Sequence, residues 1–385
     1  MKVAHVITSL TIGGAEMMLL RLLSALQSRE HQAHVICLRH GGAIADRIEA
    51  LGVPVERLNA RPGLPNPALM VRLAHHLRRI RPDVVQTWMY HADLFGGLAA
   101  QAAGGPPVAW GLHHSTLSPA YNKRSTLLTA RACAHLSRRL PAAIVCCAES
   151  TRRLHAALGY DEQRMVVIPN GFDLDEFRPD PAARIAVREE LGLSPQTRLV
   201  GLIARFHPQK DHRTFIEAAG RLCAWRDDVH VLLAGGRLDW DNTELVRWID
   251  EAGIRNRCHL LGRRTDISRI QASLDVACLS SQGGEALPLT VGEAMASGVP
   301  CVVTDVGDAA LLVGDTGRVA PVRDPEALAQ ACLSLLELPL PEWTALGAAA
   351  RRRIAEHYAL PDIAQRYAGL WDQLAERGLR WAAEM

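Results

Sequence analysis

Short apolar segments alternate with longer amphipathic segments along this chain of 385 residues, and the alternation occurs twice. Up to Gly171, the apolar runs predict seven strands separated by six helices. The expected strands are 2–7, 35–38, 54–55, 84–88, 107–110, 142–147 and 166–171, and the expected helices are 17–26, 44–51, 68–80, 94–103, 127–140 and 149–158. Strands that alternate with helices are typical of a parallel sheet covered on both faces, so this half predicts one doubly wound domain.

The same pattern restarts after Gly171, which predicts a domain boundary there. Strands are expected at 199–203, 230–234, 259–261, 276–279, 299–303 and 316–319, with helices at 213–223, 243–252, 266–272 and 289–297. Three more helices close the chain, at 325–336, 341–357 and 361–378. The last of them has an apolar stripe, suited to packing on another element, made of Ile363, Tyr367, Leu370, Trp371 and Leu374. The fold class is therefore α/β, with two doubly wound Rossmann-like domains.

The segment from Ser280 to Asp308 is the most informative part of the sequence, SSQGGEALPLTVGEAMASGVPCVVTDVGD. An apolar strand precedes it, and the glycines at 283 and 284 indicate a flexible turn. Pro288 suits the first turn of a helix that ends at Gly298, where a left-handed cap is favoured. Strand, glycine loop, helix and strand make a βαβ unit whose helix N-terminus can hold an anion. Two carboxylates, Glu285 and Glu293, lie near that helix start.

These residues resemble the donor-binding signature of retaining glycosyltransferases of family 4, which have the GT-B fold. The match comprises Glu285, Glu293, Ala294-Met295-Ala296, Gly298, Pro300, Thr304-Asp305 and Gly307. The resemblance implies two Rossmann-like domains that face each other across a cleft. Residues 1–171, with about 360–385, would form the acceptor-side domain, and 172–359 the domain that binds the nucleotide sugar. The final helix would cross back to the N-terminal domain.

A second signature of this family resembles the segment from Gly201 to Asp211, in which Ala204 stands where the family usually has glycine. The resemblance implies that Arg205 and Lys210 contact the donor diphosphate. Fixed cations suit that task, because the sugar leaves as its bond to an anionic diphosphate breaks. Arginine can hold phosphate oxygens in a fork, whereas lysine acts as a point charge.

The resemblance also assigns the other ligand contacts. Glu293 would bind the ribose hydroxyls and Glu285 the sugar hydroxyls. The backbone N–H groups of Ala286 and Leu287 would lie near the sugar, and those of Leu289 and Thr290 near phosphate. The family usually has Gly-Phe after the first glutamate, so Ala286-Leu287 leaves the shape of the sugar pocket open.

Four further positions carry alternatives that the sequence does not resolve. His113 matches a family histidine that contacts the donor sugar, and His114 or His91 could contribute nearby. Gly14 lies in a glycine loop that either admits the ligand or only turns the chain. Arg263 resembles a position that frames the nucleotide base, and a helix start capped by Thr265 or Asp266 explains the segment equally well; both can be true. Asp173-Leu174-Asp175 has the spacing of a metal motif, but its turn-forming neighbours favour a structural role.

Composition excludes several classes of protein. The nine cysteines lack metal-ligand spacing, which favours reduced thiols and a cytoplasmic location. No apolar run is long enough to span a bilayer, and Met1 and Lys2 lead directly into a strand with no signal peptide. Basic groups lack an array of stacking aromatics, which argues against nucleic acid as a partner. Residues 1–171 hold 19 Lys and Arg against 10 Asp and Glu, whereas the rest holds 24 against 31.

The sequence therefore predicts an enzyme that moves a sugar from a UDP- or GDP-sugar to an acceptor hydroxyl with retention of configuration. It predicts no metal or other cofactor. The basic first half favours a glycan or lipid-linked acceptor and peripheral contact with an anionic membrane, in polysaccharide, lipopolysaccharide or glycolipid synthesis. The alternatives are a sugar-nucleotide 2-epimerase on the same fold and a catalytically silent protein that binds sugar nucleotides.

Overall fold

In the computed structural model, which describes residues 1–27, 31–60 and 67–383, the chain forms first one parallel sheet and then a second. Its contacts divide it into unit 1, Met1–Gly171 with Leu360–Met385, and unit 2, Phe172–Ala359. The sheet of unit 1 has the strand order β3-β2-β1-β4-β5-β6-β7. Its strands are β1 (Lys2–Ile7), β2 (Gln32–Cys37), β3 (Val55–Arg57), β4 (Val84–Trp88), β5 (Val108–Leu112), β6 (Ala143–Cys146) and β7 (Met165–Val167).

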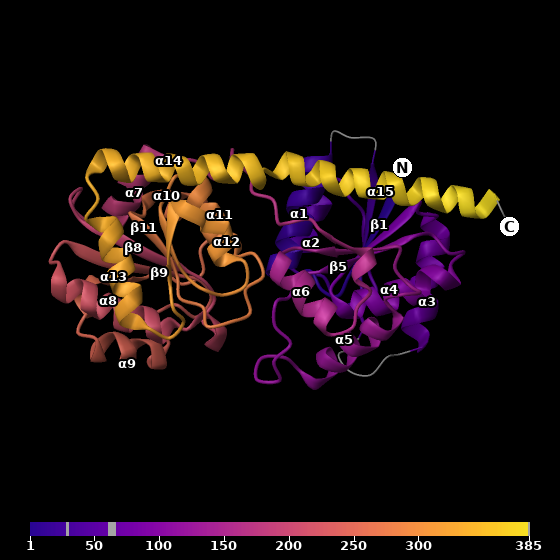
Figure 1. Cartoon of the computed structure of the whole chain (residues 1–385), viewed down its shortest axis with the longest axis horizontal. Helices are drawn as coiled ribbons and strands as arrows, with labels where there is room; N and C mark the ends of the chain where they lie inside the picture. The colour runs from indigo at the N-terminus through magenta and orange to yellow at the C-terminus, as the bar shows by residue number, and fades with distance from the viewer. Residues whose placement is uncertain (28–30, 61–66, 384–385) are drawn as a thin grey trace. The chain divides into compact units, whose positions relative to one another are not determined.

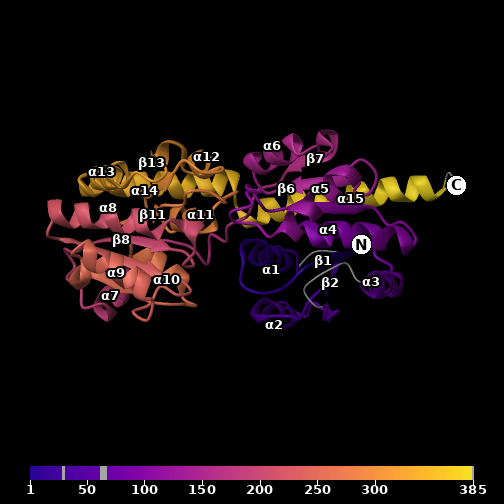
Figure 2. The same ribbon diagram turned by 90° about the horizontal axis from the view of Figure 1, so that it is seen from below.

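Helices cover both faces of this sheet (Figures 1 and 2). The helices of unit 1 are α1 (Gly14–Leu26), α2 (Ala43–Ala50), α3 (Pro67–Ile80), α4 (Tyr90–Ala102), α5 (Arg124–Leu136), α6 (Glu149–Ala157) and α15 (Leu360–Ala383). Successive residues of β1 point to opposite faces: Val3 and Ile7 pack with α1, α2 and α15, whereas Ala4 and Val6 pack with α3, α4 and α5. A strand buried on both faces must be apolar throughout, which explains the continuous apolar runs of the sequence.

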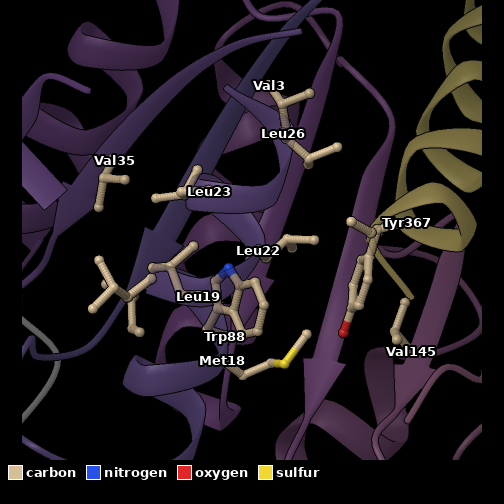
Figure 3. Close-up of a cluster of buried hydrophobic side chains, with 14 of the residues drawn as sticks. Val3, Met18, Leu19, Leu22, Leu23, Leu26, Val35, Trp88, Val145 and Tyr367 are labelled. Carbon is tan, nitrogen blue, oxygen red and sulfur yellow. The ribbon is translucent and has the colours of Figure 1, made fainter. Parts of the chain in front are cut away.

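The last helix, α15, packs on unit 1, as the apolar stripe predicted. Tyr367 and Trp371 are buried in the same core cluster as Trp88 of β4 and Met18 of α1, and Figure 3 shows Tyr367 beside Trp88 and the leucines of α1. The indole N–H of Trp371 donates to the side-chain oxygen of Gln86 at 3.0 Å. Residues 360–374 of α15 therefore complete the core of a unit whose other strands and helices precede Gly171.

Unit 2 repeats the architecture with the strand order β10-β9-β8-β11-β12-β13. Its strands are β8 (Arg198–Ile203), β9 (Val229–Ala234), β10 (Cys258–Leu260), β11 (Val276–Leu279), β12 (Cys301–Thr304) and β13 (Gly317–Ala320). Its helices are α7 (Pro181–Glu190), α8 (His212–Trp225), α9 (Thr243–Glu251), α10 (Ile267–Ser273), α11 (Leu289–Ala296), α12 (Ala309–Val313), α13 (Pro325–Leu336) and α14 (Leu340–His357). Strands of both sheets pair in parallel.

Several predicted helix boundaries were wrong, and two helices were not predicted. The helix predicted at 127–140 is α5, Arg124–Leu136, because Ser137 turns back and donates its hydroxyl to the Ala134 carbonyl at 2.7 Å. α4 begins at Tyr90, four residues before the predicted start. The helices α7 and α12 were not predicted. Asp180 caps α7 by accepting the N–H of Ala183 at 2.8 Å, and this Asp-Pro start was a signal in the sequence.

Candidate active site

The ends of four strands in unit 2 bring their loops together at the carboxyl edge of the sheet. β10, β9, β8 and β11 are neighbours, so the segments that follow them lie side by side. Gly235, after β9, has a φ of +148°, and a Cβ there would overlap the carbonyl oxygen of Ala204 after β8. Its N–H donates to the carbonyl of Gly262 after β10 at 2.7 Å. Parallel sheets bind ligands at this edge, so these loops form the candidate site.

Lys210 and Glu285, which were predicted from separate motifs, form an ion pair at this edge. Lys210 ends a short 3₁₀ turn, Pro208–Lys210, after β8, and Glu285 lies in the loop after β11. The Lys210 ammonium donates to Oε1 of Glu285, which also accepts a 2.6 Å hydrogen bond from the Ser281 hydroxyl. An ammonium has three donors, so Lys210 can hold Glu285 and still bind another anionic oxygen.

Sequence reasoning missed two serines that support Lys210 and Glu285. Ser280 donates its hydroxyl to the carbonyl oxygen of Lys210 at 2.8 Å, and Ser281 orients Glu285. Thr304, at the end of β12, donates to the carbonyl of Ser281 at 2.6 Å. The signal for these roles was only that Ser280 and Ser281 directly follow a buried strand. Lys210, the partner of Ser280, lies 70 residues away in the sequence, so the sheet had to bring the two together, whereas Glu285 lies only four residues after Ser281.

Arg205 differs from Lys210 because its guanidinium is exposed and has no hydrogen-bond or ion-pair partner in the part of the chain that the structure describes. Arg263, after β10, is also exposed. The neighbouring Arg264, by contrast, forms ion pairs with Glu190 and Asp266. Of the two residues considered as the cap, Asp266 rather than Thr265 holds the N-cap position of α10, but its side chain makes no capping hydrogen bond. Its carboxylate instead pairs with Arg264 and Arg269.

The loop around Ala286 and Leu287 is packed against the start of α12. A Cβ at Gly307, whose φ is +57°, would overlap the carbonyl oxygen of Glu285. The N–H of Asp308 donates to the Ala286 carbonyl at 2.9 Å. Both Ala286 and Leu287 are buried. The contact fixes the backbone that carries Glu285, and only glycine fits at 307.

α11 begins directly after this loop. The helix begins at Leu289 as predicted, and Pro288 occupies the N-cap position instead of the first turn. No side chain caps the helix there. Among the described hydrogen bonds, none uses the N–H of Leu289 or Thr290, which are half-buried in the first turn. These free donors and the helix dipole favour an anion. Glu293 lies one turn further along and is buried, and Gly298 has the predicted left-handed conformation with a φ of +74°.

Unit 1 places His113 at the carboxyl end of β5. Its imidazole stacks on Trp88, the last residue of β4, with ring centroids 5.2 Å apart. Burial lowers the pKa of His113 to about 4, with a smaller contribution from His114, so the ring is neutral at pH 7. Its buried Nε2 atom has no hydrogen-bond partner among the residues that are described. A neutral imidazole with an unused ring nitrogen is suited to bind a hydroxyl group.

The remaining predicted positions of unit 1 lie at the same sheet edge. Gly14 is the first residue of α1, directly after β1 and its loop. His114 packs against the edge of the Tyr90 ring, with centroids 5.9 Å apart. His91, in the first turn of α4, has a pKa lowered by burial and by Arg39. Sequence reasoning did not identify Trp88, although it ends a strand beside the candidate histidines.

Asp173, in the proposed structural motif of unit 2, has the local role that its neighbours predicted. Its Oδ1 accepts the N–H groups of Asp175 at 2.9 Å and of Glu176 at 3.0 Å. This hydrogen-bonded turn fixes the chain directly after Phe172, where unit 2 begins.

Two doubly wound parallel-sheet units with this set of strand-end loops have the GT-B architecture of glycosyltransferases. The model of "Glycosyltransferase Family 4" matches residues 12–176, and that of "Glycosyl transferases group 1" matches residues 197–338. The chain belongs to family 4 of the glycosyltransferases.

Several characterised proteins are similar to the chain. The UDP-Gal:alpha-D-GlcNAc-diphosphoundecaprenol alpha-1,3-galactosyltransferase of Escherichia coli is 26% identical over 312 residues, 79% of each chain. The phosphatidyl-myo-inositol mannosyltransferase of Mycolicibacterium smegmatis is 31% identical over 263 residues, 66% of this chain and 62% of that protein. Among solved structures, Anabaena HepE in complex with UDP superposes with a TM-score of 0.85 at 24% identity, over 97% of this chain and all of HepE.

Two further findings concern membrane-spanning helices and cysteines. No helix within residues 1–27, 31–60 and 67–383 is long and apolar enough to cross a membrane. The nine cysteines are buried as free thiols.

Proposed function

We propose that this glycosyltransferase moves a hexosyl group from a nucleoside diphosphate sugar to an acceptor hydroxyl with retention of configuration. The observation that carries the proposal is the ion pair of Lys210 and Glu285 in the loops that include exposed Arg205 and lead into the open first turn of α11. These groups supply cations and N–H donors for a diphosphate, and a carboxylate for hydroxyl groups. The name of the E. coli relative includes UDP-Gal, and HepE is solved with UDP and with UDP-glucose, so UDP-sugars are the first donors to test.

Each residue has a distinct role in this proposal. Arg205 and Lys210 stabilise the charge that develops on the leaving diphosphate, and Leu289 and Thr290 offer their N–H groups to phosphate. Glu285 binds sugar hydroxyls while Lys210 and Ser281 hold its Oε1 atom. The buried Glu293 accepts the ribose hydroxyls, and Arg263 borders the base.

Retention at the anomeric carbon then follows from a reaction on one face of the sugar. The bond to the diphosphate breaks as the acceptor hydroxyl arrives on that same face, and the departing phosphate oxygen takes the proton of that hydroxyl. His113 and the loop of Gly14, from unit 1, are proposed to contact the sugar. A product with inverted configuration would contradict this mechanism.

We further propose that the reaction needs no metal ion. The support is that Lys210 and Arg205 already provide positive charge for the diphosphate. Activity should therefore persist in excess EDTA. Loss of activity that magnesium or manganese restores would show that a cation completes the site.

A lipid-linked or membrane-proximal acceptor is the proposed partner. Two of the relatives have lipid-linked substrates in their names. On α5, Arg124, Leu128 and Arg131 recur at helical spacing on one exposed face, and the Leu128 side chain is 64% exposed. An apolar side chain between cations is typical of a helix that lies at a membrane surface. By contrast, Arg152 of the same basic region is already paired with Glu149 and Glu162.

Calorimetric titration of UDP, GDP and ADP tests the donor proposal directly. UDP should bind to the wild type and at least about tenfold more weakly to Arg205→Ala, because one charged hydrogen bond to phosphate is lost. Binding of none of the three would refute the donor site. Incubation with the corresponding sugar nucleotide alone tests the epimerase alternative, because only a 2-epimerase would form an epimer. An unchanged donor leaves transfer and silent binding, which are separated by whether sugar is transferred when an acceptor is added.

A further inference from the structure

Unit 2 has a concave surface at the edge of its sheet opposite to the candidate donor loops. A pocket of about 570 Å³ lies beside the amino ends of β8, β11 and β12, and α14 forms one of its walls. This volume is within the range of small-molecule sites in proteins. The candidate donor loops follow the carboxyl ends of the same strands, so the pocket is distinct from them.

Positive charge dominates the lining of this pocket. Four arginines, Arg184, Arg198, Arg351 and Arg352, face two aspartates, Asp180 and Asp275. The buried carboxylate of Asp275 is shared among three guanidinium groups, at 2.7 Å from Arg184, 2.6 Å from Arg188 and 3.3 Å from Arg198. The four lining arginines outnumber the two lining aspartates, so a further anion would stabilise this pocket.

Two of the lining arginines form no salt bridge with a described residue, although the Asp175 carboxylate acts on Arg351 from a longer distance. Arg352 is exposed and makes no side-chain hydrogen bond or ion pair within the part of unit 2 that the structure describes. Arg351 donates only to backbone carbonyls, those of Phe177 at 2.7 Å, Leu174 at 2.9 Å and Ala296. Guanidinium groups with unused donors favour a phosphate, whose oxygens accept paired hydrogen bonds.

The rest of the lining is apolar. Leu274 and Val299 lie at the base, and Leu340, whose side chain is 65% exposed, lies on α14. The ring of Trp343 is held in place because its N–H donates to the Asp275 carbonyl oxygen at 2.9 Å. An apolar wall next to uncompensated cations matches an amphipathic ligand rather than a free phosphate ion.

We propose that this pocket binds an amphipathic organic phosphate, with the phosphate at Arg352 and Arg198 and a hydrocarbon chain against Trp343 and Leu340. The ligand would also touch the C-terminal end of α11, since the pocket includes Ser297 and Gly298. Arg351 caps that end through the Ala296 carbonyl, and an anion would compete for this guanidinium. Because the first turn of α11 lies at the donor site, we expect the ligand to weaken donor binding, an effect that rests on the proposed function.

Isothermal titration with octyl phosphate tests the site in the full chain. Octyl phosphate should bind to the wild type, and octanol, inorganic phosphate and AMP should each bind about tenfold or more weakly. Ala348→Trp, which fills the pocket from an exposed position of α14, should abolish binding, and Arg352→Glu should weaken it at least about tenfold. Ala345→Trp on the same helix and Arg247→Glu on α9 are the matched controls and should bind as the wild type does.

Three outcomes would overturn the proposal. Tighter binding of AMP than of octyl phosphate would indicate a nucleotide site. Equal binding of octanol and octyl phosphate would indicate a merely apolar surface. Loss of octyl phosphate binding in Arg205→Ala but not in Arg352→Glu would place the probe at the donor site. Co-sedimentation with vesicles that contain phosphatidic acid distinguishes two sources of the phosphate group, a lipid head group and a soluble ligand. Weaker sedimentation of Ala348→Trp than of Ala345→Trp identifies a lipid head group, and equal sedimentation of the two variants identifies a soluble ligand, because both variants keep the basic surface of α5.

The effect on the donor site needs a second titration. Saturating octyl phosphate should weaken UDP binding about fivefold in the wild type and leave it unchanged in Ala348→Trp. An unchanged UDP affinity in the wild type would refute the coupling. If UDP does not bind at all, the donor proposal fails, but the binding of octyl phosphate and its loss in Ala348→Trp still decide whether the pocket is a ligand site.

Discussion

Lys210 and Arg205 have the same charge and follow the same strand, but their surroundings differ. Lys210 is paired with the buried Glu285, whereas Arg205 is exposed and without a partner in residues 172–359. Removal of Lys210 therefore leaves a buried carboxylate without its cation, which is costly. Removal of Arg205 affects only what binds there.

We predict that Arg205→Ala and Lys210→Ala each lower kcat/KM by about a hundredfold or more, the scale of losing one group that stabilises developing charge. Arg205→Ala should keep the wild-type Tm, and Lys210→Ala should lose on the order of 2 kcal/mol of stability. Steady-state kinetics and thermal unfolding measure both effects. Arg247→Ala, on the exposed surface of α9, is the control, and wild-type turnover in either variant would refute the diphosphate contacts.

Asp93 is a buried carboxyl group of α4 that supports the strand leading to His113. Its Oδ1 accepts the hydroxyl of Thr87 at 2.5 Å and the N–H of Gly111 at 3.4 Å. Burial raises the pKa of Asp93 to about 7, although both hydrogen bonds oppose the rise. A folded-state pKa above the unfolded value stabilises the protein at low pH, and this contribution is lost as the pH rises through 7.

Asp93→Asn is therefore predicted to gain stability relative to the wild type as the pH is raised from 5 to 8. The relative change should be about 2 kcal/mol, because the amide stays neutral while the unfolded aspartate ionises. Urea unfolding at the two pH values measures it. Asp46→Asn, which removes an 81% exposed carboxylate, is the control. A stability difference that does not change with pH would show that Asp93 is ionised in the fold.

At the scale of elements, the donor site depends on how tightly the loop before α11 packs on the start of α12. Gly307 permits this contact because its φ is positive and its Cα lies against the Glu285 carbonyl. At Gly283, in the same loop, an added methyl group would meet no atom within 4 Å. The two glycines therefore serve different purposes.

Gly307→Ala should displace the Glu285 backbone, weaken UDP binding about tenfold and lower stability by at least about 1 kcal/mol, since a side chain is strained at positive φ. Gly283→Ala should bind UDP and unfold as the wild type does. Titration calorimetry with UDP and thermal unfolding measure both. Equal behaviour of the two variants would show that the contact between the loop and α12 does not position Glu285.

For the whole molecule, the important feature is the uneven distribution of charge. Residues 1–171 carry a net charge of +9 and the rest −7. Arg124, Arg131, Arg138 and Arg139 are exposed and lack ion-pair partners among the described residues, so the basic half is not neutralised locally. Each such cation near an anionic membrane contributes about 1 kcal/mol, which suffices for reversible attachment.

We predict that the protein sediments with vesicles rich in anionic lipid and that raised salt releases it. Arg138→Glu with Arg139→Glu should reduce binding at least about tenfold, and Leu128→Ser should reduce it further. A double change of Arg213 and Arg247 to Glu keeps the net charge of the first variant and should bind as the wild type does. Equal binding to neutral and anionic vesicles, or none to either, would refute the membrane contact.

The sequence by itself determined the two-unit α/β architecture and the motifs of the site. The reason is local: apolar runs fix the strands of a parallel sheet, and the residues of the Ser280–Asp308 segment carry the strand, loop and helix that place Glu285. The apolar stripe of α15 predicted that this helix packs on another element, and the family resemblance implied that the element belongs to unit 1. The errors at α4, α5, α7 and α12 lie at helix boundaries and in short helices, where single caps such as Ser137 and Asp180 decide.

Only the tertiary structure decided which distant residues meet. It paired Lys210 with Glu285, stacked Trp88 on His113 and placed three arginines around Asp275. Such contacts join residues whose spacing along the chain carries no periodic signal, because the order of strands in a sheet brings them together. The degree of burial also depends on the whole fold, so the pKa values of Asp93 and His113 could not be inferred from their neighbours in the sequence.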